Sequence, residues 1–324
     1  MLYAAFKKNI DSKVKELKVS QFSGYVAEHS AYHHGEASLI GAIVGMAQDF
    51  VGSNNINLLY PSGGFGSRDL GGKDHAAARY IFTYLTELTR LIFNKVDDNI
   101  LNYLQDDGQS IEPNYYLPII PMILINGSEG IGTGYSCKIP SFNPLDIIAN
   151  VRAWIKEEEL KPMTPWYKNF EGSILAEPSI PGKFNIFGKI KVLDNRHVQI
   201  TELPIGLWTT KYKEMLDDLE NKKKKIKSYT SNNEGEHINM IVEFEPADLA
   251  KYLADNSIYR VLKLIKSAHT RNMYAWSSEG KIVHYHDTSE IIQEFCDVRY
   301  DGYVRRKEFL VEKLTKEKDM LWYK

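Results

Sequence analysis

Several features that mark other protein classes are missing from this 324-residue sequence. It has only two cysteines, Cys137 and Cys296, far apart in the chain, which excludes a cysteine-rich zinc site and favours a reducing intracellular compartment. No apolar run approaches the roughly twenty residues that cross a bilayer. The first residues lack the basic and apolar regions of a signal peptide. The sequence therefore predicts an intracellular protein with no membrane partner.

A large charge of one sign is also absent. The formal net charge is -2, from 40 basic and 42 acidic residues. Because nucleic-acid-binding domains often carry a basic excess, this balance argues weakly against such a function. The charges are unevenly distributed, however: lysines gather within residues 1–20, and acidic residues gather within 97–112. A basic face on a nearly neutral body is consistent with this pattern.

The pattern of apolar residues predicts an α+β protein with two or three structural units. Residues 36–50 and 81–92 each place apolar side chains on one helical face, and residues 56–61 resemble a short strand. Between them, residues 62–72 are so rich in glycine that we expect a flexible loop. Helices, a short strand and a glycine-rich loop in this order suggest a winged helix-turn-helix, a fold that lays one helix in the DNA major groove.

The rest of the chain mixes helices and strands. A helix is expected at 144–159, strands at 183–193, 197–203 and 238–245, and a polar surface loop at 221–237. A long helix is expected from Thr288, with Asp287 and Glu290 forming a capping box. Its later leucines are spaced by four and seven among many charges, which is typical of a coiled-coil arm.

Two motifs permit more than one interpretation. Residues 126–134, NGSEGIGTG, invite comparison with a nucleotide-binding loop, but no lysine follows in register and Pro140 prevents a long helix, so a tight structural turn fits better. His33 and His34 lie at the start of the helix predicted from residue 36. Adjacent residues on a helix do not face the same way, so they suit a phosphate or a capping role better than a metal.

Tyr80 directly follows Arg79, and Arg68 and Lys73 precede both. A half-buried aromatic residue at the start of a helix is one interpretation, but it leaves the neighbouring cations without a role. A free phenol is a weak nucleophile at neutral pH, and adjacent cations both stabilise a phenolate and hold a phosphodiester for attack. The arrangement therefore also fits a tyrosine that exchanges one phosphodiester bond for another.

Six segments of the chain closely resemble the breakage–reunion region of type IIA DNA topoisomerases, in the branch of eukaryotic topoisomerase II and of large DNA viruses. The resemblance extends from about Phe6 to the end and rests on AYHHGE, FVGSNN, GGFGSR, GGKDHAAARYIFT, PIIPMILINGSEGIGTGYS and YKNFEGSI. It implies a winged-helix DNA-cleavage domain at 1–119, a tower domain at 120–282 and the first part of a coiled-coil arm at 283–324.

The resemblance also implies the catalytic roles. Tyr80 matches the nucleophile that attacks a DNA phosphodiester and forms a transient 5′-phosphotyrosyl link, leaving a 3′ hydroxyl. The link conserves the bond energy, so religation needs no cofactor of its own. Arg79 matches the arginine that braces the scissile phosphate, and His34 matches a histidine near that phosphate.

The expected DNA contacts lie on either side of this site. Ile131 matches an isoleucine that wedges between base pairs and bends the duplex. Lys73 and Arg68 belong to the loop that approaches the DNA backbone. Lys7 and Lys8, in the basic stretch at the N-terminus, are also expected to contact DNA.

The resemblance implies that the full enzyme uses Mg²⁺ and ATP and passes one DNA duplex through another as a homodimer. No metal ligands and no cofactor site are expected in this part, because no TOPRIM-type acidic cluster, ATPase domain or exit gate is found in it. As a fragment of a longer polypeptide, it is expected to bind double-stranded DNA but to cleave it poorly without the TOPRIM and ATPase parts. The expected location is the nucleus, or the host cytoplasm or viral factory for a viral protein.

Two alternatives from other classes stay open. The first is a non-catalytic winged-helix module that bends DNA, which would bind in a salt-sensitive way without forming a covalent adduct. The second is a nucleotide-binding enzyme built around residues 126–134, which would show saturable nucleotide binding.

Overall fold

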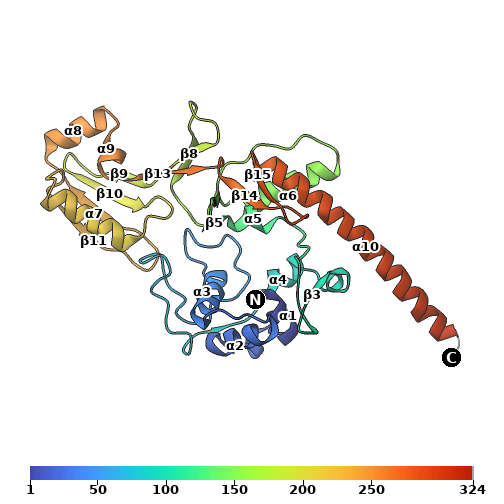
Figure 1. Ribbon diagram of the computed structural model, residues 1–324. Helices are drawn as coiled ribbons and strands as arrows, with labels where there is room; N and C mark the ends of the chain where they lie inside the picture. Colours follow the sequence, from blue (N-terminus) through green and yellow to red (C-terminus); the bar gives the residue numbers. More distant parts are fainter. Residues whose placement is uncertain (323–324) are drawn as a thin grey trace.

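The structure, a computed structural model, describes residues 1–322 and combines helices with antiparallel strands (Figure 1). Every pairing of named strands described in that range is antiparallel. The predicted mixture of α and β structure is therefore confirmed. No helix among these residues is both long and apolar enough to cross a membrane.

The N-terminal core is formed by short helices and a minimal sheet. Its elements are α1 (Leu2–Lys8), η1 (Lys13–Lys15), β1 (Leu17–Lys18), α2 (Val19–His29), α3 (Glu36–Ala47) and β2 (Phe82–Thr83). Leu39, Ile43 and Val44 on one face of α3 are buried against α2, as the spacing of apolar residues predicts. The helix predicted at 36–50 is confirmed, although it ends three residues early.

The helix predicted to follow Tyr80 is wrong over its first half. Residues 81–85 are extended: β2 pairs with β1, Ser62 and Phe82 form an isolated bridge, and so do Leu59 and Leu85. Helix α4 begins only at Glu87 and ends at Ile92. Burial alternates along 81–85, so the apolar residues that fit a helical stripe fit a strand as well. The strand predicted at 56–61 is reduced to the isolated bridge at Leu59.

The segment that we call the glycine-rich loop, residues 63–78, is irregular but firmly attached. The Gln48 side-chain amide donates hydrogen bonds to the carbonyl oxygens of Phe65 (2.9 Å) and Gly72 (3.1 Å). The backbone N–H of Ser67 donates to Asp74 Oδ1 at 2.9 Å. Partial burial raises the pKa of the Asp74 carboxyl, but hydrogen bonds from Ser67 outweigh that effect and the net shift is downward. The expected flexible loop is therefore a fixed one.

The central core brings together distant parts of the sequence. The elements around it are α4, η2 (Lys95–Ile100), β3 (Tyr103–Asp106), β4 (Gln109–Pro113), α5 (Met122–Asn126), β5 (Ser128–Gly132), β6 (Tyr135–Ile139), α6 (Pro144–Ile155), β14 (Met273–Trp276), β15 (Ile282–Tyr285) and the start of α10 (Thr288–Trp322). The helix predicted at 144–159 is confirmed in α6. Because Leu58, Ile92 and Phe93 pack here with residues 120–163 and 273–296, this core crosses the domain boundaries expected at 119 and 282.

The outer lobe, residues 189–264, has its own core and lies at the end of the molecule opposite the tip of α10 (Figure 1). A sheet in the order β11–β12–β10–β9 packs against α7, and Val198 and Ile200 alternate into the core. The elements are β9 (Lys189–Val192), β10 (His197–Glu202), α7 (Thr209–Asn221), β11 (Ser228–Ser231), β12 (Met240–Glu243), α8 (Pro246–Ala254) and α9 (Ile258–Val261). The strands predicted at 197–203 and 238–245 are confirmed in β10 and β12. The strand predicted at 183–193 is interrupted at Gly188, so only β9 belongs to this sheet, and the surface loop expected at 221–237 contains β11.

A three-stranded sheet connects the outer lobe to the centre, in the order β13–β8–β7. Its strands are β7 (Ser173–Ala176), β8 (Lys183–Phe187) and β13 (Ile265–His269). In the register of this sheet, Lys266 lies opposite Ile186. The segment that leaves the lobe therefore returns beside the segment that entered it.

Helix α10 (Thr288–Trp322) begins in the central core and extends far beyond it (Figure 1). The backbone N–H groups of Ser289 and Glu290 donate to Asp287 Oδ1, so the predicted cap is confirmed. The buried Asp97 carboxylate pairs with Arg299 at 2.9 Å and with Arg306 at 3.3 Å. This network fixes the direction in which the long helix leaves the core.

Replacement of Gly71 by alanine is expected to destabilise the fold. Gly71 has φ +63°, and an added Cβ would lie 2.3 Å from the Trp208 indole. Left-handed strain and overpacking together are expected to lower the free energy of unfolding by about 2–4 kcal/mol, measured by urea denaturation. Gly41→Ala is the control, because nothing lies within 4 Å of its Cβ position on α3; it is expected to raise stability by about 0.5–1 kcal/mol. Equal effects of the two changes would contradict the packing described.

Candidate nucleic-acid interface

Tyr80 projects from a backbone that is fixed on both sides. Its own N–H donates to the Ala77 carbonyl oxygen at 2.9 Å, and the next residue, Ile81, is 1 % exposed in the N-terminal core. The N–H of Val19 donates to the Ile81 carbonyl oxygen at 2.9 Å, and the N–H of Ser20 donates to Ala78. The Tyr80 side chain, in contrast, is 65 % exposed. The local structure therefore presents the phenol to solvent from a rigid support.

Arg79 lies beside the phenol. Its guanidinium carbon is 4.8 Å from the centroid of the Tyr80 ring, and the residue is exposed. A guanidinium over an aromatic ring is attracted to its face, and its N–H groups remain able to hold phosphate oxygens in a bidentate manner. The pair therefore combines a nucleophilic oxygen with an anion-binding group on one open surface.

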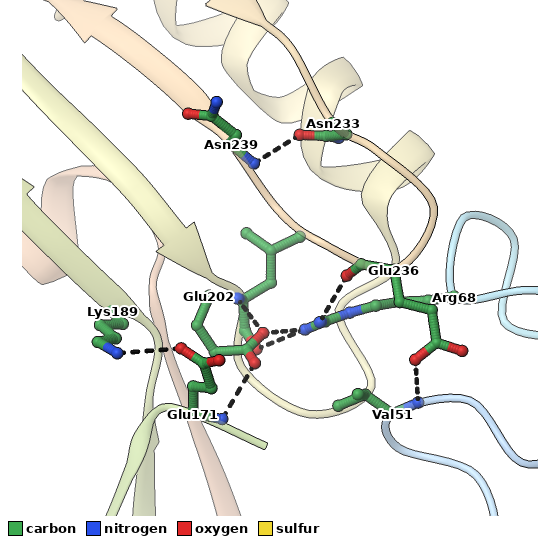
Figure 2. A network of polar contacts seen from close by, with 9 residues as sticks. Val51, Arg68, Glu171, Lys189, Glu202, Asn233, Glu236 and Asn239 are labelled. Atoms are coloured by element: carbon green, nitrogen blue, oxygen red, sulfur yellow. Dashed lines mark hydrogen bonds and ion pairs between the residues drawn. The ribbon is translucent and has the colours of Figure 1, made fainter. Parts of the chain in front are cut away.

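The two cations of the glycine-rich loop have different positions. Lys73 is exposed and free to reach an anionic ligand. Arg68 is 5 % exposed and is ion-paired with Glu202 of the outer lobe, which is 2 % exposed (Figure 2). The prediction that Arg68 contacts DNA is therefore wrong for this structure, because its charge is already neutralised inside the protein. Sequence reasoning missed Glu202, since nothing in the spacing links two residues so far apart.

The remaining predicted residues of the first domain are exposed but are not joined to Tyr80 by any contact described within residues 1–322. His34 precedes Gly35, the N-cap of α3, and its ring lies edge-on to Tyr32 at 5.3 Å. Lys7 and Lys8 lie in the last turn of α1, over the rings of Tyr3 and Tyr25. The structure thus places Arg79 beside the Tyr80 ring. His34, Lys7 and Lys8 do not contact this pair, and only a shared ligand would connect them with it.

Ile131 is an unusually exposed apolar residue. It lies in β5, opposite Ser136 of β6, and is 92 % exposed. Gly130 and Gly132 flank it, so the two adjacent positions carry no side chain. Since these glycines form a hairpin and not a loop that opens a helix, the nucleotide-binding alternative lacks the geometry that it needs.

Sequence reasoning also missed a cavity at the base of this hairpin, where Glu129 pairs with Lys138 at 3.0 Å. The cavity has a volume of about 670 Å³, and Lys138 of β6 and Lys266 of β13 both line it. Burial lowers the pKa of Lys266, and the nearby positive charge of Lys138 lowers it further. The two lysines come from distant segments, so only the fold reveals that they share a cavity.

A resident metal centre is not evident in the part of the chain that the structure describes. No group of three or more histidine, cysteine, aspartate or glutamate side chains in that part is arranged to hold a metal ion.

Comparisons with known proteins agree on one family. Residues 1–323 match the family that is described as the A subunit of DNA gyrase/topoisomerase IV. The chain is 46% identical over 325 residues to DNA topoisomerase 2 of Candida albicans, covering 99% of this chain and 22% of the relative. It is 48% identical over 324 residues to DNA topoisomerase 2 of Plasmodium falciparum, covering 99% of this chain and 23% of the relative. The chain thus spans less than a quarter of the length of these relatives.

A solved structure is similar over almost the whole chain. It is the Plasmodium falciparum topoisomerase II DNA-binding, cleavage and re-ligation domain, with a TM-score of 0.94 and 48% sequence identity. The similarity covers 98% of this chain and 43% of the other.

Replacement of Ile131 by alanine is expected to leave the stability of the free protein nearly unchanged. Because the side chain is almost fully exposed, the free energy of unfolding should change by less than about 1 kcal/mol. Ile147→Ala in α6 is the comparison, because Ile147 is fully buried and its truncation should cost about 2–5 kcal/mol. A large loss of stability in the Ile131 variant, measured by chemical denaturation, would show that the residue serves packing.

Proposed function

Because this chain belongs to the DNA gyrase/topoisomerase IV family and is homologous to eukaryotic DNA topoisomerase 2, we propose that it is the DNA-binding and cleavage part of a type II DNA topoisomerase. In this proposal residues 1–119 act as a winged-helix domain, residues 120–282 as a tower domain and residues 283–324 as the start of a coiled-coil arm. The substrate is double-stranded DNA, and the complete enzyme acts as a homodimer.

The observation that carries the proposal is the exposed Tyr80 phenol with the Arg79 guanidinium over its ring. The Tyr80 oxygen attacks the phosphorus of a DNA phosphodiester, and the bond from phosphorus to the 3′ oxygen breaks. The phenol proton passes to solvent or to a neighbouring base, and the departing 3′ oxygen takes up a proton. The product is a 5′-phosphotyrosyl link, which the 3′ hydroxyl reverses during religation without an external energy source.

The other predicted site residues also have proposed roles. Arg79 holds the non-bridging oxygens of the scissile phosphate, and His34 approaches the same phosphate from the start of α3. Lys73, Lys7 and Lys8 are exposed and contact the DNA backbone, which fixes the position of the duplex without reading its sequence.

Mg²⁺ and ATP belong to other parts of the full enzyme in this proposal. A TOPRIM domain of the same polypeptide holds the metal, which stabilises the attacking and leaving oxygens when it is bound. An ATPase domain couples hydrolysis to duplex passage. This chain by itself is therefore expected to bind DNA and to cleave it poorly. A nuclear or viral-factory location stays a prediction.

Ile131 is proposed to bend the DNA. An isoleucine that is 92 % exposed at the end of a hairpin can insert between two base pairs without rearranging the protein. Unstacking one step costs about a few kcal/mol, and the bent duplex offsets this cost by covering more protein surface. Bending would also bring the duplex toward Lys138 and Lys266, whose cavity lies next to β5.

Tyr80→Phe is expected to abolish covalent attachment to DNA while duplex binding stays within about twofold, because only the attacking oxygen is removed. The chain is mixed with a TOPRIM-containing segment of the Plasmodium falciparum relative, Mg²⁺ and end-labelled duplex DNA. Denaturant and protease treatment then reveals any adduct, and EDTA should prevent its formation.

Tyr115→Phe is the matched control, since Tyr115 is also exposed (42 %) but lies outside the proposed site. It should form the adduct at the rate of the unmodified chain. Salt-sensitive binding with no adduct in the unmodified chain would instead favour the DNA-bending module that does no chemistry.

Ile131→Ala is expected to reduce DNA bending. The end-to-end distance of a short duplex, measured by fluorescence energy transfer, should lengthen toward that of free DNA when the variant binds, because the wedge is gone. Leu145→Ala is the control, since Leu145 is also a large exposed apolar residue (72 %) and lies on α6. Equal bending by both variants would remove Ile131 from the proposal.

A further inference from the structure

We propose that the buried ion pair between Arg68 and Glu202 is a positioning device for Tyr80. It locks the glycine-rich loop, which leads directly to the tyrosine, onto the outer lobe. This inference rests on the proposed function, because it assigns the pair a role in the cleavage step. Arg68 and Glu202 are positioning residues and do not touch DNA.

The ion pair is buried, and further hydrogen bonds surround both side chains (Figure 2). The side chains of Arg68 and Glu202 are 6% and 3% exposed. Besides the pair itself, Arg68 Nη2 donates to the Leu203 carbonyl oxygen at 3.3 Å, and Nη1 donates to that of Glu236 at 3.5 Å. The Glu202 carboxylate also accepts from the N–H groups of Leu203 (2.8 Å) and Glu171 (3.1 Å). The Glu202 carboxylate therefore binds three segments of the chain, at Arg68, at Glu171 and at Leu203.

The same loop has a second attachment to the lobe. The N–H groups of Thr209 and Thr210, at the start of α7, donate to the carbonyl oxygens of Arg68 (3.4 Å) and Asp69 (3.1 Å). The Trp208 indole lies so close to Gly71 that a Cβ could not fit between them. Arg68 is thus held by its side chain and its backbone at once, which leaves little freedom to the loop around it.

Hydrogen bonds continue from Arg68 toward Tyr80. The N–H of Gly72 donates to the Ser67 carbonyl oxygen (2.8 Å), and the N–H of Ala76 donates to that of Gly64 (2.8 Å). The N–H of Tyr80 then donates to Ala77 at 2.9 Å. Val19 and Ser20 hold the backbone at Ile81 and Ala78, so a shift of the loop relative to the lobe would act on the turn at Ala77–Tyr80, which joins the loop to that fixed backbone.

A buried ion pair is better suited to fixing a geometry than to adding stability. The cost of removing two charges from water offsets most of their attraction, so an apolar pair in its place is often equally or more stable. The N-terminal core and the lobe have separate apolar cores, and Trp208, which packs against Phe50 and Gly71, is the apolar contact that accompanies the ion pair where they meet. In-line attack on phosphorus tolerates little error, because a displacement of about 1 Å can reduce the rate by about 100-fold. The Arg68–Glu202 pair holds the glycine-rich loop in one arrangement relative to the outer lobe.

Two variants separate positioning from stability. Arg68→Lys keeps the charge but loses the planar fork that fits a carboxylate. The double variant Arg68→Met/Glu202→Leu removes both charges and leaves no unpaired ion, so it should remain folded. In both, the adduct rate with the TOPRIM segment and Mg²⁺ should fall about 10- to 100-fold, whereas the Kd for duplex DNA should change less than about threefold.

Lys189→Met is the matched control. Lys189 lies opposite Glu202 in the sheet, but its side chain is 52% exposed and pairs with Glu171 at the edge of the network, so the substitution leaves the Arg68–Glu202 ion pair in place. The adduct rate of this variant should equal that of the unmodified chain. Circular dichroism confirms that each variant is folded at the assay temperature.

Hydrogen exchange tests the inference without any chemistry. In the free chain, the amide protons of Gly72, Ala76 and Tyr80 should exchange at least about tenfold faster in both Arg68 variants than in the unmodified chain or Lys189→Met. Unchanged exchange, or a normal adduct rate in the double variant, would overturn the positioning role and leave the proposed function intact. Failure of the unmodified chain to form any adduct would instead contradict the proposed function. The exchange data would still decide whether the ion pair fixes the loop.

Discussion

The proposed chemistry of this protein depends on the fixed backbone of residues 78–85. Hydrogen bonds from Val19 and Ser20 hold one edge of this segment, and the bridges at Ser62 and Leu59 hold the other. Ile81 is buried directly after the exposed Tyr80. A phenol on a mobile loop would rarely meet a phosphate in line, whereas this support fixes the point on the backbone from which the phenol projects.

Buried charges connect parts of the molecule that lie far apart in the sequence. Arg68 and Glu202 join the glycine-rich loop to the outer lobe, and Asp97 joins η2 to Arg299 and Arg306 of α10. Both networks span long distances in sequence, and both are deeply buried. Such contacts tolerate few geometries, because a displaced partner would leave an unpaired charge inside the protein. They therefore restrict how the joined segments can be arranged, in addition to the apolar packing around them.

The candidate site residues, in contrast to these buried charges, are exposed. Tyr80, Arg79 and Ile131 contribute little to any core, yet they stand on elements that are tightly fixed. Exposed apolar and nucleophilic groups on rigid supports indicate binding and chemistry more than packing. In the proposed function this surface acts on a DNA duplex, and the geometry explains why these particular side chains are available to it.

The sequence by itself determined the family, the mixture of helices and strands, and α3, α6 and α10, and it gave Tyr80, Arg79 and Ile131 as candidate site residues. These follow from local motifs and from periodic burial, which the chain carries within short segments. Only the tertiary structure decided that residues 81–85 are extended, that Arg68 is buried against Glu202, that the glycine-rich loop is fixed, and that the central core crosses the expected domain boundaries. Local patterns cannot settle these points, because an alternating segment fits either a helix or a strand, and a charge reveals its partner only when folding brings distant segments together.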